Sequence, residues 1–281
     1  MATIETAPAR ARLRGLEGKN VLVTGGTSGI GQAIAVKFAE FGANVAINYL
    51  SRPEEASETE QQIQTCMDKV QRSGVRDVLV RGDVSKEDDV VRMFEEAVDQ
   101  LGSLDVLVNN AGIQISRPSH ELSAADFDKV LAVNLRGSFL CAREAIKHFL
   151  AEEKPGVIVN VSSVHQRIPK PSYLGYSVSK GGMQNLTTTL ALEYAGRGIR
   201  VNAIGPGATV TPINRAWIDD PVKRAMVTDH IPIPRPGEAD EMAATACFLA
   251  SDDGGYITGQ TIYVDGGLTL YADFREPWSS E

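Results

Sequence analysis

Short apolar runs alternate with longer amphipathic stretches along most of this chain. Runs such as 19–23 and 157–161 predict strands, because a strand buried on both faces is apolar at consecutive positions. Stretches such as 86–101 carry apolar residues at three- and four-residue spacing, which predicts helices with one buried face. The predicted strands are 19–23, 43–48, 77–81, 104–108, 157–161, 200–204 and 261–264, and the predicted helices are 32–41, 54–72, 86–101, 127–150 and 173–195.

The alternation of strand and helix predicts an α/β fold class. Parallel strands joined by right-handed helical crossovers form a doubly wound sheet, here a single seven-stranded parallel sheet with helices on both faces. Ligands bind to such sheets beyond the carboxyl ends of the strands. The polar and glycine-rich motifs of this chain directly follow predicted strands or lie on the next helix, so we expect one site at that edge.

A glycine-rich segment joins the first predicted strand to the first predicted helix. It reads Thr24-Gly-Gly-Thr-Ser-Gly-Ile-Gly31, with the spacing Gly-x-x-x-Gly-x-Gly. Glycines let the backbone turn tightly and approach a ligand closely, and a helix N-terminus offers free N–H groups to a pyrophosphate. The strand before the segment and the helix after it favour a dinucleotide site over an ordinary turn.

Tyr176 and Lys180 lie four residues apart in Tyr-Ser-Val-Ser-Lys, and Ser163 lies thirteen residues before Tyr176. A helical spacing of four brings the ammonium near the phenol, where its charge lowers a phenol pKa that is ordinarily near ~10. A serine hydroxyl can hold a substrate oxygen against the phenol while a proton moves. Although isolated Tyr-x-x-x-Lys pairs are common on helix surfaces, this trio indicates acid–base chemistry on an alcohol or a carbonyl.

Composition excludes several other classes of function. The 281 residues are 43% hydrophobic and 23% charged, which suits one soluble α/β domain. The net charge of -8 argues against nucleic-acid binding, and no apolar run is long enough to span a membrane. Cys66, Cys141 and Cys247 are odd in number and far apart, which favours free thiols in a reducing cytoplasm. The four scattered histidines predict no metal site.

In their order along the chain, these motifs are similar to those of the short-chain dehydrogenase/reductase family. The resemblance is carried, over about residues 17–270, by Thr24-Gly-x-x-x-Gly-x-Gly31, Asn109-Asn-Ala-Gly112, Asn134, Ser163, Tyr176-x-x-x-Lys180 and Pro206-Gly207. Within the family, the chain resembles bacterial glucose 1-dehydrogenases in Ser162-Ser-Val-His165, Ser179-Lys-Gly-Gly-Met183, Gly205-Pro-Gly-Ala208, Thr211-Pro-Ile-Asn214 and Asp265-Gly-Gly-Leu-Thr-Leu-Tyr271. The resemblance implies a Rossmann fold and an NAD(P)-dependent oxidoreductase.

The resemblance also implies which residues bind the dinucleotide. Asp83 and Val84 would contact the adenine ring, small residues after the fourth strand would let the cofactor lie against the backbone, and the segment after the sixth strand would close over the nicotinamide. The full set of expected cofactor contacts is Gly25, Thr27, Ser28, Gly29, Ile30, Gly31, Tyr49, Ser51, Arg52, Asp83, Val84, Asn110, Ala111, Gly112, Tyr176, Lys180, Pro206, Gly207, Thr209 and Thr211.

The end of the second predicted strand bears on the choice between NAD and NADP. An Asp there would bind the ribose hydroxyls and repel a 2′-phosphate, whereas this chain reads Asn48-Tyr-Leu-Ser-Arg52. Ser51 and Arg52 offer groups that bind phosphate, but Leu50 stands where similar enzymes often carry a basic residue. We therefore expect NADP as the preferred cofactor, with NAD also accepted.

The catalytic residues that the resemblance implies are Asn134, Ser163, Tyr176 and Lys180. Tyr176 would take the proton of a substrate hydroxyl and Ser163 would bind the same oxygen. Lys180 would lower the Tyr176 pKa and contact the nicotinamide ribose. Since asparagine is unfavourable inside a helix, Asn134 predicts a kink, which would bind a water that connects Lys180 to solvent.

The sequence defines the substrate less sharply. His165 would bind a sugar hydroxyl beside Ser163 and Tyr176, and Gln114 and Asn214 are further expected substrate contacts, although related enzymes can have an acidic residue at the Gln114 position. The first hypothesis is oxidation of a sugar such as β-D-glucose to its lactone. The second is a 3-oxoacyl-carrier-protein or general ketone reductase, which a basic patch near the mouth would favour. The third is a non-catalytic dinucleotide-binding sensor of redox state.

The expected organisation is an arm followed by one domain. Residues 1–16, with arginines among alanines, predict a flexible N-terminal arm, and 17–281 predict a single Rossmann-fold oxidoreductase domain. The proline-rich run 212–236 predicts a mobile substrate lid. Family relatives commonly pair the helices 127–150 and 173–195, so the resemblance implies a homotetramer. We expect a cytoplasmic protein with a small-molecule substrate and no nucleic-acid or membrane partner.

Overall fold

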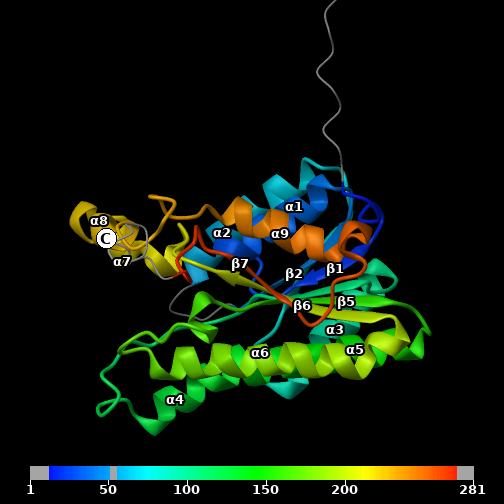
Figure 1. The fold of residues 1–281 in the computed structure, drawn as a ribbon. Coiled ribbons are helices and arrows are strands. Elements are labelled where there is room, and N and C mark those ends of the chain that lie inside the picture. Colours follow the sequence, from blue (N-terminus) through cyan, green and yellow to red (C-terminus); the bar gives the residue numbers. More distant parts are fainter. Residues whose placement is uncertain (1–12, 51–55, 271–281) are drawn as a thin grey trace, which may run out of the picture.

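A seven-stranded parallel sheet organises the chain, which the computed structural model describes over residues 13–50 and 56–270 (Figure 1). The strand order is β3-β2-β1-β4-β5-β6-β7, and every neighbouring pair of strands is parallel. The order reverses direction at β1, so β1 and β4 flank the crevice in which doubly wound sheets bind ligands. The predicted fold class is therefore confirmed.

The elements that were predicted lie within about three residues of their predicted positions. The strands are β1 Asn20–Val23, β2 Asn44–Tyr49, β3 Asp77–Arg81, β4 Val106–Asn109, β5 Gly156–Val161, β6 Ile199–Pro206 and β7 Thr261–Val264. The helices are α1 Gly29–Glu40, α2 Ala56–Gln71, α3 Glu87–Leu101, α4 Ala124–Leu131, α5 Gly137–Ala151, α6 Leu174–Tyr194, α7 Arg215–Ile218, α8 Pro221–Thr228 and α9 Ala239–Ala250.

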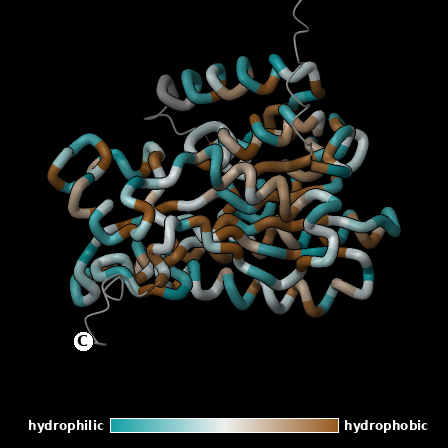
Figure 2. The backbone as a smooth tube through the Cα atoms, turned by 45° about the horizontal axis from the view of Figure 1, so that its top comes forward, coloured by the Kyte–Doolittle hydropathy of each residue, from teal (hydrophilic) through white to brown (hydrophobic). Residues whose placement is uncertain are grey.

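Two hydrophobic cores, one on each face of the sheet, explain why the strands are continuously apolar. In β1, Val21 and Val23 face the core formed with α1, α2 and α9, whereas Leu22 faces the core formed with α3, α5 and α6. Successive side chains of a strand point to opposite faces, so a strand covered on both sides needs apolar residues throughout. The hydrophobic residues accordingly concentrate along the strands in the middle of the molecule (Figure 2).

The helix predicted at 127–150 begins earlier and is interrupted. It starts as α4, where the Ser123 hydroxyl caps the helix by accepting a hydrogen bond of 3.0 Å from the Asp126 N–H. It then passes through a π-helical turn at Ala132–Arg136 and continues as α5. Asn134 lies inside this turn, and the Ser138 hydroxyl donates to its carbonyl oxygen at 2.8 Å. The predicted kink at Asn134 thus takes the form of a π-turn, a feature frequent at functional sites.

Helix α9 was not predicted from the sequence. It begins with a capping box in which Glu238 and Glu241 reciprocally bind each other's backbone N–H groups. Its small residues Ala243 and Ala246 are fully buried in the same core as α1, so the helix covers one face of the sheet. Because the segment is rich in alanine, its apolar and polar positions differ little in hydrophobicity, and its periodicity did not predict a helix.

The packed part of the chain begins earlier than predicted. Leu16 is fully buried, Leu13 packs against the core, and the Arg14 guanidinium contacts the Asp253 carboxylate at 2.7 Å. Residues 13–16, which were predicted as the end of a flexible arm, therefore pack against the domain, and 1–12 lie outside the described residues. None of the described helices is long and apolar enough to cross a membrane.

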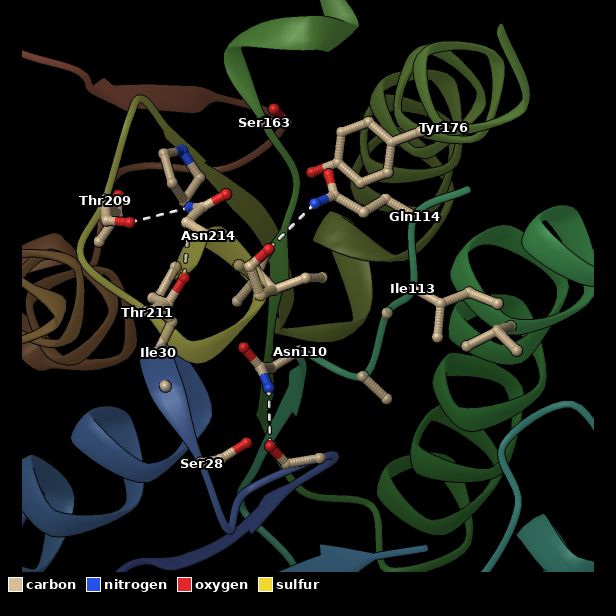
Figure 3. Close-up of a pocket in the computed structure, with 18 of the residues that line it drawn as sticks. Ser28, Ile30, Asn110, Ile113, Gln114, Ser163, Tyr176, Thr209, Thr211 and Asn214 are labelled. Atoms are coloured by element: carbon tan, nitrogen blue, oxygen red, sulfur yellow. Dashed lines mark hydrogen bonds between the residues drawn. The ribbon is translucent and has the colours of Figure 1, made fainter. Parts of the chain in front are cut away.

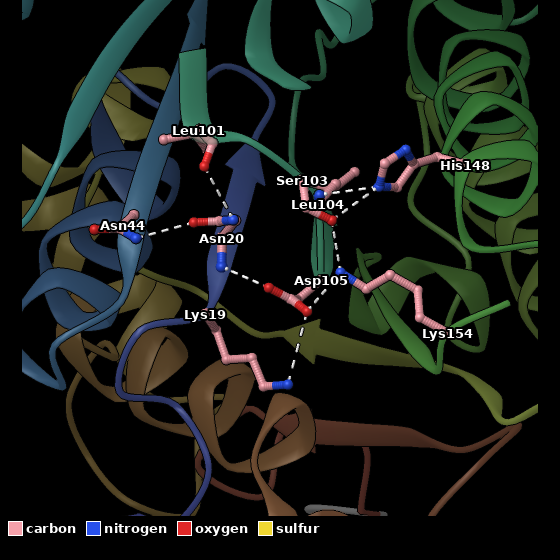
Figure 4. A network of polar contacts seen from close by, with 9 residues as sticks. All are labelled: Lys19, Asn20, Asn44, Leu101, Ser103, Leu104, Asp105, His148 and Lys154. Atoms are coloured by element: carbon pink, nitrogen blue, oxygen red, sulfur yellow. Dashed lines mark hydrogen bonds and ion pairs between the residues drawn. The ribbon is translucent and has the colours of Figure 1, made fainter. Parts of the chain in front are cut away.

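A polar network ties the strands together at the edge opposite the site (Figure 4). The Asp105 carboxylate, at the start of β4, accepts a hydrogen bond of 2.9 Å from the Asn20 N–H and contacts Lys154 Nζ at 2.9 Å and Lys19 Nζ at 3.7 Å. His148 Nε2 accepts from the Leu104 N–H at 3.0 Å. The network therefore joins β1, β4 and the end of α5 at the amino ends of the strands.

Candidate active site

A cavity of about 1020 Å³ lies at the carboxyl ends of the strands, where the sequence predicted a site (Figure 3). Residues that directly follow β1 to β6 line it, so most of the sheet contributes to one site. Its volume is at the upper end of the range typical of ligand pockets, which suits a dinucleotide together with a small substrate.

Most of the predicted contacts meet in this cavity. Among the described residues that were predicted to bind cofactor or substrate, or to catalyse, all but Gly31 and Asn134 line it. Ser51 and Arg52, which were predicted to bind the cofactor, lie outside the described residues. Gly31 and Asn134 are both buried, and each contacts residues near the cavity: Gly31 packs against Gly25 and Asn110, and Asn134 binds Ile113 and Ser179.

The glycine-rich segment is held in a fixed shape by polar groups of neighbouring strands. Gly25 has a φ of 59° and Gly29 a φ of 55°, which only glycine adopts readily. The Asn110 amide donates to the Gly25 carbonyl oxygen at 3.0 Å, and the Gly25 N–H donates to Asn48 Oδ1 at 3.1 Å. A Cβ at Gly31 would overlap the Gly25 carbonyl oxygen and the Asn110 amide, so close packing requires this glycine.

The N-terminus of α1 opens toward the cavity and fits a phosphate. Ser28 is the N-cap residue, and its side chain makes no capping hydrogen bond. The first turn carries no acidic residue that would repel an anion. Free N–H groups and the positive end of the helix dipole are therefore available to the pyrophosphate of a dinucleotide.

The end of β2 borders the part of the cavity that was expected to bind the adenosine half of the cofactor. Asn48 is buried, and its amide donates to the Gly82 carbonyl oxygen at 3.0 Å, which joins β2 to β3. Leu50 and Gln62 line the cavity here, and Leu50, not a carboxylate, directly follows β2. The Asp83 carboxylate accepts from the Ser85 hydroxyl at 2.7 Å, which fixes the turn after β3.

Ser163, Tyr176 and Lys180 meet at the centre of the cavity. Ser163 follows β5 and lowers the pKa of the Tyr176 hydroxyl, and its own hydroxyl oxygen accepts from the His165 N–H at 3.1 Å. Tyr176 and Lys180 lie on the first half of α6, one turn apart. Lys180 Nζ lies 5.7 Å from the centroid of the Tyr176 ring and donates to the Val161 carbonyl oxygen at 2.7 Å.

Burial dominates the electrostatics of this trio, which corrects one expectation from the sequence. Lys180 was expected to lower the Tyr176 pKa, but burial raises the Tyr176 pKa above its usual value, and the hydrogen bond with Ser163 offsets only part of that rise. Burial also lowers the pKa of Lys180 to about 8. The Lys180 ammonium is directed at the Val161 carbonyl rather than at the phenol oxygen, so the charged forms of both groups are disfavoured in the chain alone.

Asn134 supports the cavity from behind. Its Oδ1 accepts from the Ile113 N–H at 2.8 Å, and its amide donates to the Ile113 carbonyl oxygen at 2.9 Å and to Ser179 Oγ at 3.1 Å. The Ser179 hydroxyl in turn donates to the Tyr176 carbonyl oxygen at 2.7 Å. Asn134 therefore fixes the segment after β4 against the helix that carries Tyr176.

The predicted substrate residues other than Ser163 and Tyr176, namely Gln114, His165 and Asn214, have different surroundings. The His165 ring lies 6.2 Å from the Tyr176 ring, and its Nδ1 lies 3.0 Å from the Ile168 carbonyl oxygen. The Gln114 amide donates to the Ile213 carbonyl oxygen at 3.3 Å and so links the two sides of the mouth. The Asn214 amide donates to the Thr209 carbonyl oxygen at 2.9 Å and braces its own loop (Figure 3).

Sequence reasoning missed several residues that line the cavity. They are mainly apolar or basic, and they include Ile113, Lys129, Val133, Lys170, Tyr173, Val227 and Leu268. Lys170 and Tyr173 had a usable signal, since they lie between Ser163 and Tyr176 in the chain. The described residues hold no cluster of possible metal ligands.

A family model described as "Enoyl-(Acyl carrier protein) reductase" matches residues 25–269, which include every part of the cavity described above. The chain belongs to the short-chain dehydrogenase/reductase family. As a member of this family, it is an NAD(P)-dependent oxidoreductase that acts on CH–OH groups of small molecules. The glycine-rich cradle and the free helix N-terminus fit the cofactor that this family uses.

Relatives with different substrates match nearly the whole chain. A glucose 1-dehydrogenase of Gluconobacter oxydans is 53% identical over 94% of this chain and 96% of its own length. A 3beta-hydroxysteroid dehydrogenase 1 of Eggerthella lenta is 46% identical over 92% of this chain and 97% of its own length. The crystal structure of a putative 2-deoxy-D-gluconate 3-dehydrogenase from Agrobacterium tumefaciens, with bound NADP, is 33% identical, has a TM-score of 0.81, and covers 90% of this chain and 97% of that chain.

Proposed function

We propose that this family member oxidises a hydroxyl group of a sugar, such as β-D-glucose to its lactone, with NADP as the preferred cofactor. The observation that carries the proposal is the grouping of Ser163 and His165 around the Tyr176 phenol in the cavity. Three side chains that bind oxygen there suit a substrate with several hydroxyl groups. The relatives named for glucose and for 2-deoxy-D-gluconate support the same substrate class.

We assign catalysis to Asn134, Ser163, Tyr176 and Lys180. In the oxidation, the Tyr176 phenolate accepts the proton of the substrate hydroxyl while Ser163 donates a hydrogen bond to the same oxygen. When bound, NAD(P)⁺ accepts the hydride that the carbinol carbon loses. The Lys180 ammonium is assigned to the nicotinamide ribose, and Asn134 keeps the cavity wall in register with α6.

His165 is suited to accept a hydrogen bond from the substrate. Burial lowers the pKa of His165, so the ring is neutral near pH 7. A carbonyl oxygen only accepts hydrogen bonds, so the contact with Ile168 places the ring proton on Nδ1 and leaves Nε2 as an acceptor. We assign His165 Nε2 to a second hydroxyl of the substrate, with Gln114 and Asn214 at the edge of the same pocket.

We also propose that NADP is preferred over NAD. Tyr49 ends β2 and Leu50 follows it, so neither position holds a carboxylate to repel a 2′-phosphate, and the solved relative contains NADP. Ser51 and Arg52 are assigned to the 2′-phosphate on their chemistry. The ratio of kcat/KM for NADP⁺ to that for NAD⁺ tests the assignment, and a ratio well below one would contradict it.

A second candidate is oxidation of a hydrophobic secondary alcohol. Trp217, Val227 and Leu268 line the cavity, and one relative is named for a 3β-hydroxysteroid. A carrier-protein substrate has less support, because Arg143 contacts Glu87 at 2.7 Å and Lys147 contacts Glu144 at 3.0 Å, which leaves little unpaired positive charge on that face. A redox sensor without activity would not need Ser163 and Tyr176 in hydrogen-bond contact.

One assay separates these functions. The protein is incubated with NADP⁺ and, in separate reactions, with glucose, other sugars, sugar acids, 3β-hydroxysteroids and simple secondary alcohols, and the reduced nicotinamide is followed by absorbance. We expect the highest kcat/KM with a sugar or a sugar derivative. Turnover of the steroid alone would favour the second candidate, and binding of cofactor without turnover of any alcohol or ketone would favour the sensor.

Assembly and location complete the proposal. We propose a cytoplasmic homotetramer in which α5 and α6 pair with their copies across two-fold axes, supported by the exposed apolar side chains of Phe139 and Leu192, which are 43% and 87% exposed. The run 212–236, which contains α7 and α8 and reaches the cavity through Trp217, is assigned as a substrate lid. Light scattering coupled to gel filtration tests the tetramer, and a monomeric mass would contradict it.

A further inference from the structure

The mouth of the cavity carries a lysine whose charge has no partner in the site. Lys170 lines the cavity together with Tyr173 and His165. Its Nζ lies 3.8 Å from the centroid of the Tyr173 ring, a cation–π contact that holds the ammonium in place. Burial lowers the pKa of the His165 ring, and the charge of Lys170 lowers it further, so this charge acts within the substrate half of the cavity.

The loop that presents Lys170 is fixed at several points. The Tyr173 N–H donates to the Lys170 carbonyl oxygen at 3.2 Å, and the Arg117 N–H donates to the Ser172 carbonyl oxygen at 2.8 Å. Ser172 has a φ of 65°, an unfavourable conformation for a residue other than glycine. Such strain persists where the surrounding structure enforces it, and it is concentrated at ligand-binding sites.

The charge of Lys170 is not balanced by the rest of the cavity. In the described part of the chain, Lys170 forms no ion pair, and the only carboxylate among the lining residues is Asp83, which belongs to the adenosine half and binds Ser85. The whole protein carries a net charge of -8, so a local cation is not explained by a generally basic surface. A positioned, unpaired ammonium at the mouth of a cavity attracts anionic ligands.

We propose that Lys170 binds an anionic group of the substrate, a carboxylate or a phosphate, and so makes the site select acidic sugar derivatives over neutral sugars. This inference rests on the proposed sugar oxidation and adds the charge of the substrate to it. Tyr176 and His165 contact the reacting end of the substrate, and Lys170 contacts a charged group at the mouth. Lys170 is thus a specificity-determining residue rather than part of the proton-transfer machinery.

The test compares three substrates of related shape in four proteins. D-Gluconate carries a carboxylate, D-glucose 6-phosphate carries a phosphate, and D-glucose is neutral. The proteins are the wild type, Lys170→Met, Lys170→Arg and the matched control Arg167→Met, which removes a cation from an exposed position of the same loop that does not line the cavity. Steady-state kinetics give kcat and KM, and calorimetric titration of each sugar into the protein with NADPH bound gives a dissociation constant that needs no turnover.

We expect one or both acidic sugars to bind about tenfold more tightly than glucose, and the carboxylate and phosphate arms identify which group is recognised. Lys170→Met should remove that preference, because KM and the dissociation constant should rise more for the acidic sugar than for glucose. Lys170→Arg should retain the preference for the acidic sugar, and Arg167→Met should not change it. In the wild type, about 0.5 M salt should reduce the preference.

The inference is wrong if glucose binds as tightly as both acidic sugars, or if Lys170→Met changes all three dissociation constants alike. Those outcomes leave the proposed sugar oxidation standing whenever glucose is turned over. Conversely, Lys170-dependent binding of an acidic sugar without turnover of any sugar would uphold the anion site and contradict the proposed function.

Discussion

At the scale of single residues, burial is the main influence on the reacting groups. It raises the Tyr176 pKa and lowers the Lys180 pKa to about 8, so each group is held closer to its neutral form than it would be in water. A high tyrosine pKa makes the phenol a poor base at neutral pH, and only Ser163 among the chain's own groups is seen to counter this. The Ser163 hydroxyl is therefore expected to set the pH dependence as well as the rate.

The substitution Ser163→Ala should shift the pH profile of oxidation to higher pH. It removes the hydroxyl that lowers the Tyr176 pKa, so the rising limb of kcat should shift toward higher pH. The value of kcat should also fall by about 10² to 10³-fold. Ser162→Ala is a matched control, because the Ser162 hydroxyl binds Gln166 at 2.6 Å instead of Tyr176. An unshifted limb in Ser163→Ala would show that another group governs the ionisation.

The substitution Gly31→Ala should weaken cofactor binding. The new Cβ would overlap the Gly25 carbonyl oxygen and the Asn110 amide, which together fix the glycine-rich segment. We expect the dissociation constant for NADPH, measured by fluorescence, to rise at least about tenfold. Gly196→Ala meets no atom within 4 Å and should bind NADPH as the wild type does. Equal affinities in both variants would show that the cradle is not needed in this shape.

Residues with a fixed spacing from a strand or a helix were predictable, and residues defined by long-range contacts were not. The glycine-rich segment and the Tyr176–Lys180 pair are local patterns, so the sequence places them without knowledge of the fold. Gln114 and Asn214 were predicted to line the site, but their amides bind backbone groups of Ile213 and Thr209, contacts that the sequence did not reveal. Lys170 was missed although it lies between Ser163 and Tyr176 in the chain, because the strained loop conformation that follows it was not predicted.

At the scale of elements, α6 carries Tyr176 and Lys180, and two of its serines, Ser177 and Ser179, differ in their hydrogen bonds. Ser179 is fully buried and joins Asn134 to the Tyr176 carbonyl oxygen. Ser177 lies two residues before Ser179 on a different face of the helix, and its buried hydroxyl has no hydrogen-bond partner among the described residues. A buried hydroxyl without a hydrogen-bond partner lowers the free energy of unfolding, whereas a buried hydroxyl with a partner raises it.

Alanine substitutions at these two serines should therefore have opposite effects. Ser179→Ala should lower the free energy of unfolding by about 1–2 kcal/mol and reduce kcat, because it frees the cavity wall from α6. Ser177→Ala should leave the free energy of unfolding unchanged within about 0.5 kcal/mol or raise it. Chemical denaturation of both variants measures the difference, and a larger loss in Ser177→Ala would contradict the assigned contacts.

The elements that sequence reasoning missed or misplaced have identifiable physical causes. Helix α9 is rich in alanine, and it begins at Glu238 rather than at a Ser, Thr, Asp or Asn cap, so both of its usual signals are weak. The π-turn at Ala132–Arg136 is a short change of helix type between α4 and α5, so 127–150 was predicted as one helix with a kink at Asn134. Strand positions were predictable more closely, because burial on both faces makes every strand residue apolar.

At the scale of the whole molecule, the two edges of the sheet have separate roles. The cavity lies beyond the carboxyl ends of the strands, and the network around Asp105 lies at the amino ends (Figure 4). Burial alone would raise the Asp105 pKa, but the Asn20 N–H and the lysines Lys154 and Lys19 outweigh it, so the pKa lies below its usual value. The carboxylate therefore stabilises the fold far from the reacting groups.

The substitution Asp105→Ala should reduce stability and leave kcat/KM unchanged. Loss of the carboxylate leaves the Asn20 N–H and Lys154 without their partner, at a cost of about 2–3 kcal/mol at pH 7. Because the folded-state pKa lies below that of the unfolded chain, this contribution is complete near neutral pH and is lost as pH falls below about 4. The difference in free energy of unfolding from wild type should shrink at acid pH, and a difference that does not change with pH would contradict this origin.

The central claim is that the Tyr176 hydroxyl, next to Ser163 and beside the glycine-rich cradle, exchanges the proton during hydride transfer. Its most direct test is Tyr176→Phe, which removes one oxygen and keeps the ring, with NADPH affinity measured by fluorescence alongside kcat for the best substrate. The account predicts a loss of kcat of about 10³-fold or more with nearly unchanged NADPH affinity. A variant that keeps near-normal kcat would contradict it.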